Sequence, residues 1–175
     1  MKTTDTRRLV FCALFTALIV ILSQLQAPIG PVPVSLATLG VMLSGLLLGW
    51  RYGALAVGAY ILLGAVGVPV FAGFQGGAGR LLGPTGGYIV GYLFYAMISG
   101  LSLPRLQERF WGRCVLLLWG TAVCYVLGTA WFVQTSGRTL GESLTLCVIP
   151  FLPGDAAKIL LASFLVPRLR KAMRI

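Results

Sequence analysis

Four long stretches without a charged residue constrain this chain more than any other feature of its sequence. They cover residues 9–50, 52–79, 81–104 and 114–137. A helix crosses a bilayer with about 20 predominantly apolar residues, so each stretch has room for one or two spans. Only 10% of the residues are charged, against roughly a quarter in a soluble domain. We therefore predict an all-α integral membrane protein.

The spacing of these stretches predicts a six-transmembrane-helix bundle, formed as a single transmembrane substrate-binding domain over residues 1–175. The first stretch is not a cleaved signal peptide, because further spans follow at once and no convincing cleavage site is present. The expected spans are 9–25, 35–48, 54–68, 85–103, 115–132 and 144–166.

The basic residues predict how the bundle is oriented, because cytoplasmic loops of membrane proteins carry an excess of Lys and Arg. With both termini cytoplasmic, the outer side holds only Arg80 and Arg138. The inner side holds Lys2, Arg7, Arg8, Arg51, Arg105, Arg109, Arg113, Arg168, Arg170, Lys171 and Arg174. Topology thus explains the net charge of +10, and we expect contact with a lipid bilayer and no nucleic-acid partner.

Two outer connections are too apolar for ordinary solvated loops. "QAPIGPVPVS" is uncharged and rich in proline, and "VPVFAGFQGGAGRLLGPTGG" is long and rich in glycine. Irregular backbone at membrane depth persists only where it packs on protein or lines a cavity. We expect both to be re-entrant-like loops that fold back over the outer mouth of the bundle.

"IPFLPGDAAKILL" places Asp155 and Lys158 inside an apolar span. Pro150, Pro153 and Gly154 should break the helix, which can restart near Asp155, where the helix dipole favours a negative charge. The two side chains share one face and are predicted to bind substrate, since charges within spans usually mark functional sites. The alternatives are a structural ion pair, or a helix cap beside a lysine that extends to the interface.

"GRLLGPTGGY" forms a second candidate substrate-binding segment. It has no Gly-Lys pair and so is not a phosphate loop. Arg80 is suited to a carboxylate, although a solvated or headgroup-facing arginine is the alternative. The further candidates are Gln75, Thr85, Gly86 and Tyr88. The alternative for Gln75 is hydrogen bonding within its own loop, and the alternative for Tyr88 and Tyr92, which share a helix face, is that of ordinary core aromatics.

Ala13 and Ala17 lie one turn apart on the first expected span. Small residues at this spacing permit close helix packing, either inside the bundle or against a partner. The chain has no histidine, and its four cysteines form no CxxC pair. We therefore predict no catalytic residue, metal site or cofactor, and the protein is not expected to be an enzyme.

Four strings taken together resemble the BioY family. They are "PVPVSLATLG", "GLLLGWRYGALAVGAYILLGAVGVPVFAG", "LLGPTGGYIVGY" and "PFLPGDAAK", and the resemblance extends over roughly residues 8–168. The family consists of biotin-binding S components of energy-coupling-factor (ECF) transporters. Its first loop often reads PVTLQTLG, where this chain has Ser35 and Ala37, so no polar ligand contact is expected from position 37.

The resemblance implies a six-helix bundle in the bacterial plasma membrane with a biotin pocket near its outer side. A transmembrane coupling subunit and two ATP-binding subunits would supply the energy, and Ala13 and Ala17 would dock on the coupling subunit. Asp155 would accept the ureido N–H groups, while Lys158 would hold Asp155 or donate to ligand oxygens. The sequence leaves open which end of biotin meets this pair.

Three other functions compete with biotin uptake. The chain could be an S component for another vitamin, such as riboflavin or thiamine, with the same architecture and a different pocket. An intramembrane enzyme is disfavoured by the absence of histidine and the scarcity of acids. A structural membrane subunit would bind no small molecule.

Overall fold

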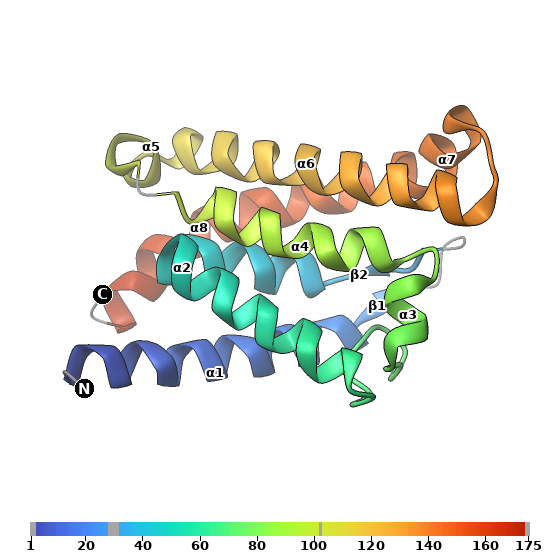
Figure 1. Ribbon diagram of the computed structural model, residues 1–175. Helices are drawn as coiled ribbons and strands as arrows, with labels where there is room; N and C mark the ends of the chain where they lie inside the picture. Colours follow the sequence, from blue (N-terminus) through green and yellow to red (C-terminus); the bar gives the residue numbers. More distant parts are fainter. Residues whose placement is uncertain (1–2, 28–31, 102, 174–175) are drawn as a thin grey trace.

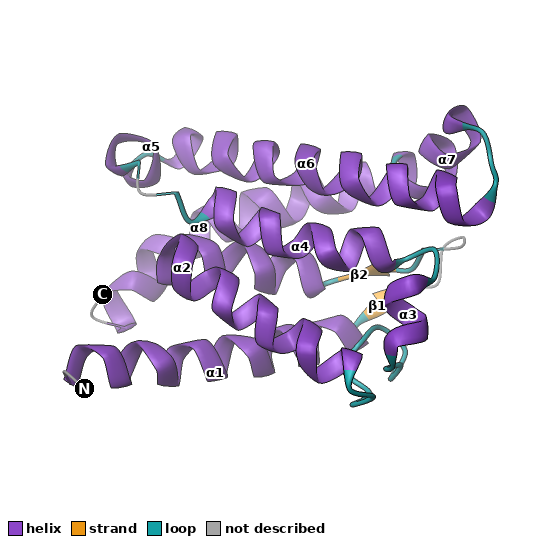
Figure 2. Cartoon of the chain, viewed as in Figure 1, coloured by secondary structure: helices purple, strands orange, loops and turns teal. Residues whose placement is uncertain are grey.

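The computed structural model describes residues 3–27, 32–101 and 103–173, and helices dominate it (Figures 1 and 2). Lys2 and Arg174, which the orientation prediction uses, lie outside these residues. The helices are α1 (Thr3–Gln24), α2 (Ala37–Ala65), α3 (Ala78–Leu82), α4 (Gly86–Ser99), α5 (Pro104–Glu108), α6 (Phe110–Ser136), α7 (Leu140–Cys147) and α8 (Leu152–Met173), with a 3-10 turn η1 (Ile149–Phe151). The strands are β1 (Gln26–Ala27) and β2 (Val34–Ser35).

Within the described residues, four helical segments are long and apolar enough to cross a membrane. They are Thr6–Gln24, Ala37–Ala65, Phe110–Ser136 and Leu140–Met173, and the shorter helix Gly86–Ser99 is also apolar. The structure thus contains the long apolar helices that the sequence predicts for a membrane protein. The predicted number of six spans is not confirmed by helix length and composition alone.

The difference between the six predicted spans and the four long helical segments arises largely in α2. This helix consists of two helical arms joined at Gly49. Gly49 has φ of +80°, a backbone conformation that glycine adopts without steric cost. A Cβ added at Gly53 would lie 2.9 Å from the Cα of Gly45, although eight residues of straight helix span about 12 Å. The second arm therefore folds back along the first, as the ribbon in Figure 1 shows.

The predicted sixth span is interrupted near Pro150, as its proline and glycine residues predict. Val148 leaves the helical conformation after α7, the 3-10 turn η1 follows, and α8 begins at Leu152. Asp155 consequently lies in the first turn of α8. The sequence predicted both the break and the restart, but it did not distinguish α7 as a separate short helix.

The bundle has two different ends, which Figure 1 places at its left and right. The left end carries both termini, and a hydrogen bond from Arg7 to the Met173 carbonyl joins them. The right end carries α3, the β1–β2 ribbon and the turn into α7. We refer to these as the terminal end and the loop end.

The described parts of the connections at the loop end contact the bundle at several points. Gln26 pairs with Ser35 in the antiparallel ribbon, whose connecting residues 28–31 lie outside the described chain. The side chains of Val70 and Phe71 are buried. Ser23 Oγ, at the end of α1, donates to the Val70 carbonyl at 2.6 Å, so α1 holds this connection in place.

Close backbone approach at Gly45 generates a first prediction. Gly45, in the first arm of α2, faces α4, and an added Cβ would overlap Ser99 Oγ and the Ala96 carbonyl oxygen. Gly45→Ala should force the two backbones apart and cost about 1–3 kcal/mol. Thermal unfolding of detergent-purified protein can be followed with a thiol-reactive fluorescent dye, because all four cysteines are buried.

Gly58→Ala is the matched control, since it lies in the same helix and an added Cβ there meets no heavy atom within 4 Å. It should leave the unfolding temperature unchanged or raise it slightly, as alanine favours helix over glycine by about 1 kcal/mol. Equal unfolding temperatures for the two variants would contradict the tight α2–α4 contact.

Candidate functional site

Asp155 is the centre of a buried polar cluster at the start of α8. Its side chain forms an ion pair with Lys158, one turn further along the same helix, at 2.8 Å between Oδ1 and Nζ. Its other oxygen, Oδ2, accepts a hydrogen bond of 2.6 Å from the Tyr125 hydroxyl of α6. Asp155 and Lys158 are only 5% and 6% exposed, so the charges are removed from solvent.

Lys158 also connects this cluster to β2 and to the start of α2. Its Nζ also donates to the Ser35 carbonyl of β2 at 2.8 Å and to Thr38 Oγ1 of α2 at 3.0 Å. With Asp155 these partners engage all three donors of the ammonium group. Lys158 therefore orients Asp155 and fastens α8 to α2, and it has no donor left over.

Asp155, by contrast, keeps acceptor capacity. A carboxylate offers about four lone-pair sites, and Lys158 and Tyr125 occupy one on each oxygen. The geometry differs from a plain helix cap, because both oxygens receive side-chain donors. The buried ammonium likewise differs from a lysine that extends to the membrane interface.

Two adjoining pockets lie beside the cluster and share Val32, Pro33, Ser35, Tyr88 and Tyr92 as common wall residues. The first pocket, of about 30 Å³, is also lined by Thr38, Cys124, Tyr125, Phe151, Asp155 and Lys158. The second, of about 40 Å³, is also lined by Ala37, Tyr60, Phe71, Ala72, Arg80, Thr85 and Ile89. A carboxylate thus lies in one pocket and a guanidinium in the other.

Aromatic side chains form the wall between these charged groups. Tyr60 and Phe71 meet edge to face with ring centroids 5.5 Å apart. The Tyr88 hydroxyl bonds to Thr129 Oγ1 at 3.0 Å, so this ring is fixed by α6 while it lines the pocket. The lining of the two pockets is therefore suited in polarity to a flat, largely apolar molecule with polar groups at its two ends.

Two predicted substrate-binding residues lie outside both pockets. Gln75 is exposed, and its backbone pairs with Phe71 in an isolated bridge. Gly86 packs against the Leu81 carbonyl, where no side chain would fit. Both shape the loops that hold Arg80 and Thr85, which do line the second pocket.

Sequence reasoning missed Tyr125 and Thr38, which complete the polar cluster. A tyrosine within an apolar span is a usable signal, because a buried hydroxyl usually finds a hydrogen-bond partner. The partner itself was not predictable, since Tyr125 and Asp155 are 30 residues apart and Thr38 and Lys158 are 120 residues apart.

The predicted docking residues occupy a different face. Ala13 and Ala17 are exposed on α1 and line an apolar groove of about 530 Å³ together with residues of α2. The hydroxyl of Thr16, also in this groove, lies 2.9 Å from the carbonyl oxygens of Cys12 and Ala56, either of which can accept its single proton. The alanines therefore do not pack inside this chain's own core.

The fold and the site together define a helical membrane protein with a buried polar cluster beside two small adjoining pockets. The family model of the BioY family matches residues 1–175. The chain belongs to the BioY family.

Relatives and a solved structure agree with this assignment. The biotin transporter BioY of Thermotoga maritima is 39% identical over 165 residues, covering 94% of this chain and 96% of the relative. The biotin transporter BioY of Lactococcus lactis is 39% identical over 173 residues, covering 94% and 91%. A crystal structure of the S component for biotin from an ECF-type ABC transporter matches with a TM-score of 0.90, 36% identity and coverage of 98% and 94%.

The buried ion pair generates a second prediction. Lys158→Met should leave the Asp155 carboxylate without its cation and cost about 3–5 kcal/mol, as breaking buried pairs does. Asp155→Asn combined with Lys158→Met removes both charges and should recover part of that loss. Both variants lose the bonds to Ser35 and Thr38 equally, so the difference in thermal unfolding isolates the charge. A double variant no more stable than Lys158→Met would contradict this account.

Proposed function

We propose that this chain captures biotin at the outer side of the bacterial plasma membrane, as the substrate-specific S component of an ECF-type transporter. The observation that carries the proposal is a buried carboxylate with free acceptor sites in one pocket and an arginine in the adjoining pocket, within a BioY-family chain. Transport, rather than catalysis, is also what its relatives' names describe.

Biotin matches the polarity of the two pockets. It has a ureido ring with two N–H donors, an apolar bicyclic body and a carboxylate at the end of an aliphatic chain. Asp155 accepts the ureido N–H groups, and Arg80 pairs with the carboxylate. Tyr88 and Tyr92 pack against the body between them. This places the ureido end at α8 and the acid end at α3.

Lys158 acts as a positioning residue in this arrangement, because protein partners engage all its donors. Tyr125 holds the second carboxylate oxygen of Asp155. Thr85 contributes to the Arg80 side of the wall, while Gln75 and Gly86 support the loops around it.

Binding requires the pockets to widen. Their volumes, about 40 and 30 Å³, are far below the ~300 Å³ of a typical small-molecule site. Val32 and Pro33 line both pockets and belong to the connection between α1 and α2, so their displacement enlarges both at once. The buried cluster at Asp155 provides a fixed end for the ligand during this change.

The proposed topology has six membrane segments within one domain over residues 1–175. The two arms of α2 count separately because the chain reverses at Gly49, and α4 crosses as a short helix packed against α2 and α6. Both termini are cytoplasmic, which puts the loop end and its pockets outside and the basic terminal end inside.

Energy comes from partner subunits in this proposal, namely a transmembrane coupling subunit and two ATP-binding subunits. The chain has no nucleotide-binding motif of its own. The exposed groove at Ala13 and Ala17 supports docking, since a partner helix can approach closely where side chains are small.

Binding of labelled biotin to the purified chain at equilibrium is the direct test and a third prediction. Wild-type protein should bind biotin, and excess riboflavin or thiamine should not compete. Asp155→Asn should weaken biotin and biotin methyl ester alike, by roughly tenfold or more, because a charge-assisted hydrogen bond contributes about 1.5–3 kcal/mol. Arg80→Gln should weaken biotin strongly and the uncharged ester hardly at all.

The two variants serve as controls for each other, since each should affect one end of the ligand. Wild-type affinity in folded Asp155→Asn protein would reject the ureido contact. Equal losses for acid and ester in Arg80→Gln would show that Arg80 shapes its loop and does not pair with the carboxylate. Competition by another vitamin would assign the chain to that vitamin.

The groove on α1 generates a fourth prediction. Replacing both Ala13 and Ala17 by tryptophan should block close approach of a partner helix. Biotin binding by the isolated chain should stay near normal, because these residues line a groove separate from both pockets. Co-purification with the coupling subunit and biotin uptake into cells should both fall.

Pull-down, uptake and binding are measured on the same double variant, so that folding and docking are distinguished. Replacing Gly141, which is exposed near the start of α7, by tryptophan is a control for bulk at the surface. Full recruitment of the coupling subunit by the double variant would reject the docking role. Loss of biotin binding as well would show that the alanines support the bundle itself.

A further inference from the structure

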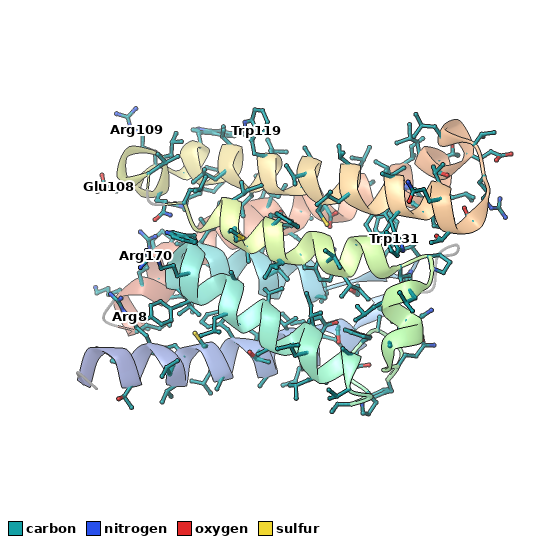
Figure 3. All side chains as sticks on the ribbon, viewed as in Figure 1. Arg8, Glu108, Arg109, Trp119, Trp131 and Arg170 are labelled. Atoms are coloured by element: carbon teal, nitrogen blue, oxygen red, sulfur yellow. The ribbon has the colours of Figure 1, made fainter. Side chains whose placement is uncertain are left out.

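A larger cavity, of about 440 Å³, lies at the terminal end and shares no lining residue with the two ligand pockets. Three arginines from three helical segments line it: Arg8 of α1, Arg51 of α2 and Arg170 of α8. Figure 3 shows Arg8 and Arg170 at this end of the molecule. Nothing in the proposed capture of biotin uses these residues.

The cavity is strongly cationic. None of its described lining residues is acidic, and the ion pair found within the described chain is that of Asp155 and Lys158, which belongs to the ligand site. Glu108 lies at the same end in Figure 3 but does not line the cavity. Three guanidinium groups around one space repel each other unless an anion lies between them.

Arg170 is held ready for such an anion. Its Nη2 donates to the Leu46 carbonyl at 2.8 Å and to Gln107 Oε1 at 2.7 Å, which fixes the plane of the guanidinium. The donors on its Nε and Nη1 have no hydrogen-bond partner among the residues the structure describes. These free donors lie on separate edges of the guanidinium, so each can donate to one oxygen of an anion.

Aromatic rings position the other two arginines. The Arg8 guanidinium lies 5.3 Å from the Tyr52 ring centroid, and that of Arg51 lies 5.0 Å from the Trp50 ring centroid. Stacking of this kind leaves the guanidinium edge, with its N–H groups, available for an anion. The three cations are therefore partly ordered before any ligand arrives.

Apart from Gln107 and two glycines, the remaining lining consists of aliphatic and aromatic side chains, and these indicate the source of the anion. Phe11, Leu47 and Leu48 line the same space as the arginines, and Trp50 is of the residue type that gathers at membrane interfaces. A free phosphate ion gains nothing from apolar walls, whereas a phospholipid presents its phosphate directly beside hydrocarbon. Basic pockets between membrane helices are suited to anionic headgroups.

We propose that this cavity binds the phosphate of an anionic phospholipid from the surrounding leaflet. The headgroup is held by Arg8, Arg51 and Arg170, while its glycerol and upper acyl region contact the apolar walls. Such a lipid would contact α1, α2 and α8 together. These helices meet at the terminal end, which carries both chain termini and the reversal of α2 at Gly49. The proposal is independent of the identity of the transported vitamin.

Native mass spectrometry of the detergent-purified full chain tests this with phosphatidylglycerol and phosphatidylcholine of identical acyl chains. Wild-type protein should retain phosphatidylglycerol preferentially. Arg51→Gln and Arg170→Gln should each lower its retention roughly fivefold, since a basic residue contributes about 1 kcal/mol toward an anionic lipid surface. Arg138→Gln is the control, because it removes an exposed arginine between α6 and α7, far from the cavity.

Folding is checked by thiol-dye thermal unfolding of each variant. Arg51→Gln keeps the test informative if Arg170→Gln fails to fold, since Arg51 contacts the Trp50 ring and makes no hydrogen bond within the described chain. Equal retention of the two lipids, or an equal loss in Arg138→Gln, would overturn the proposal. Inorganic phosphate or glycerol 3-phosphate that displaces phosphatidylglycerol at low millimolar concentration would reassign the cavity to a free phosphate and overturn the lipid source.

Discussion

The buried ion pair between Asp155 and Lys158 is the interaction on which the loop end of this molecule depends. Two charges inside an apolar bundle are tolerable only if they are paired and hydrogen-bonded, because the desolvation cost of an unpaired charge is several kcal/mol. Lys158 meets this requirement with three acceptors from α8, β2 and α2. The pairing therefore fixes the start of α8 against the start of α2, and the ligand pockets lie where those elements meet.

This arrangement divides the work between the two charged residues. Lys158 is fully engaged with protein groups, whereas Asp155 retains acceptor sites toward the pocket. Tyr125 then sets the orientation of the carboxylate from α6. A ligand that brings N–H donors completes the cluster without disturbing the bonds that hold it. The site is thus rigid at its polar base, while the connection that carries Val32 and Pro33 lies over the same pockets.

The three proposed tasks are separated in space. The proposed vitamin site lies at the loop end, the small-residue groove runs along α1 and α2, and the arginine-lined cavity lies at the terminal end. The reversal of α2 at Gly49 connects them, because its first arm carries Thr38 near the ligand site and its second arm carries Ala59 in the groove. Residues of α2 consequently line all three places.

The sequence by itself determined the membrane class, the break before α8, the shared face of Asp155 and Lys158, and membership of the BioY family, which the family match confirms. These features depend on hydropathy, helix period and proline, which act over a few residues. Tertiary structure decided that Tyr125 and Thr38 complete the polar cluster and that Lys158 has no free donor. It also decided that Gln75 and Gly86 lie outside both pockets. It further fixed Gly49 as the residue at which α2 reverses, within the gap between the expected spans 35–48 and 54–68. Contacts between residues 30 to 120 positions apart follow from how whole helices pack, and no local pattern records that.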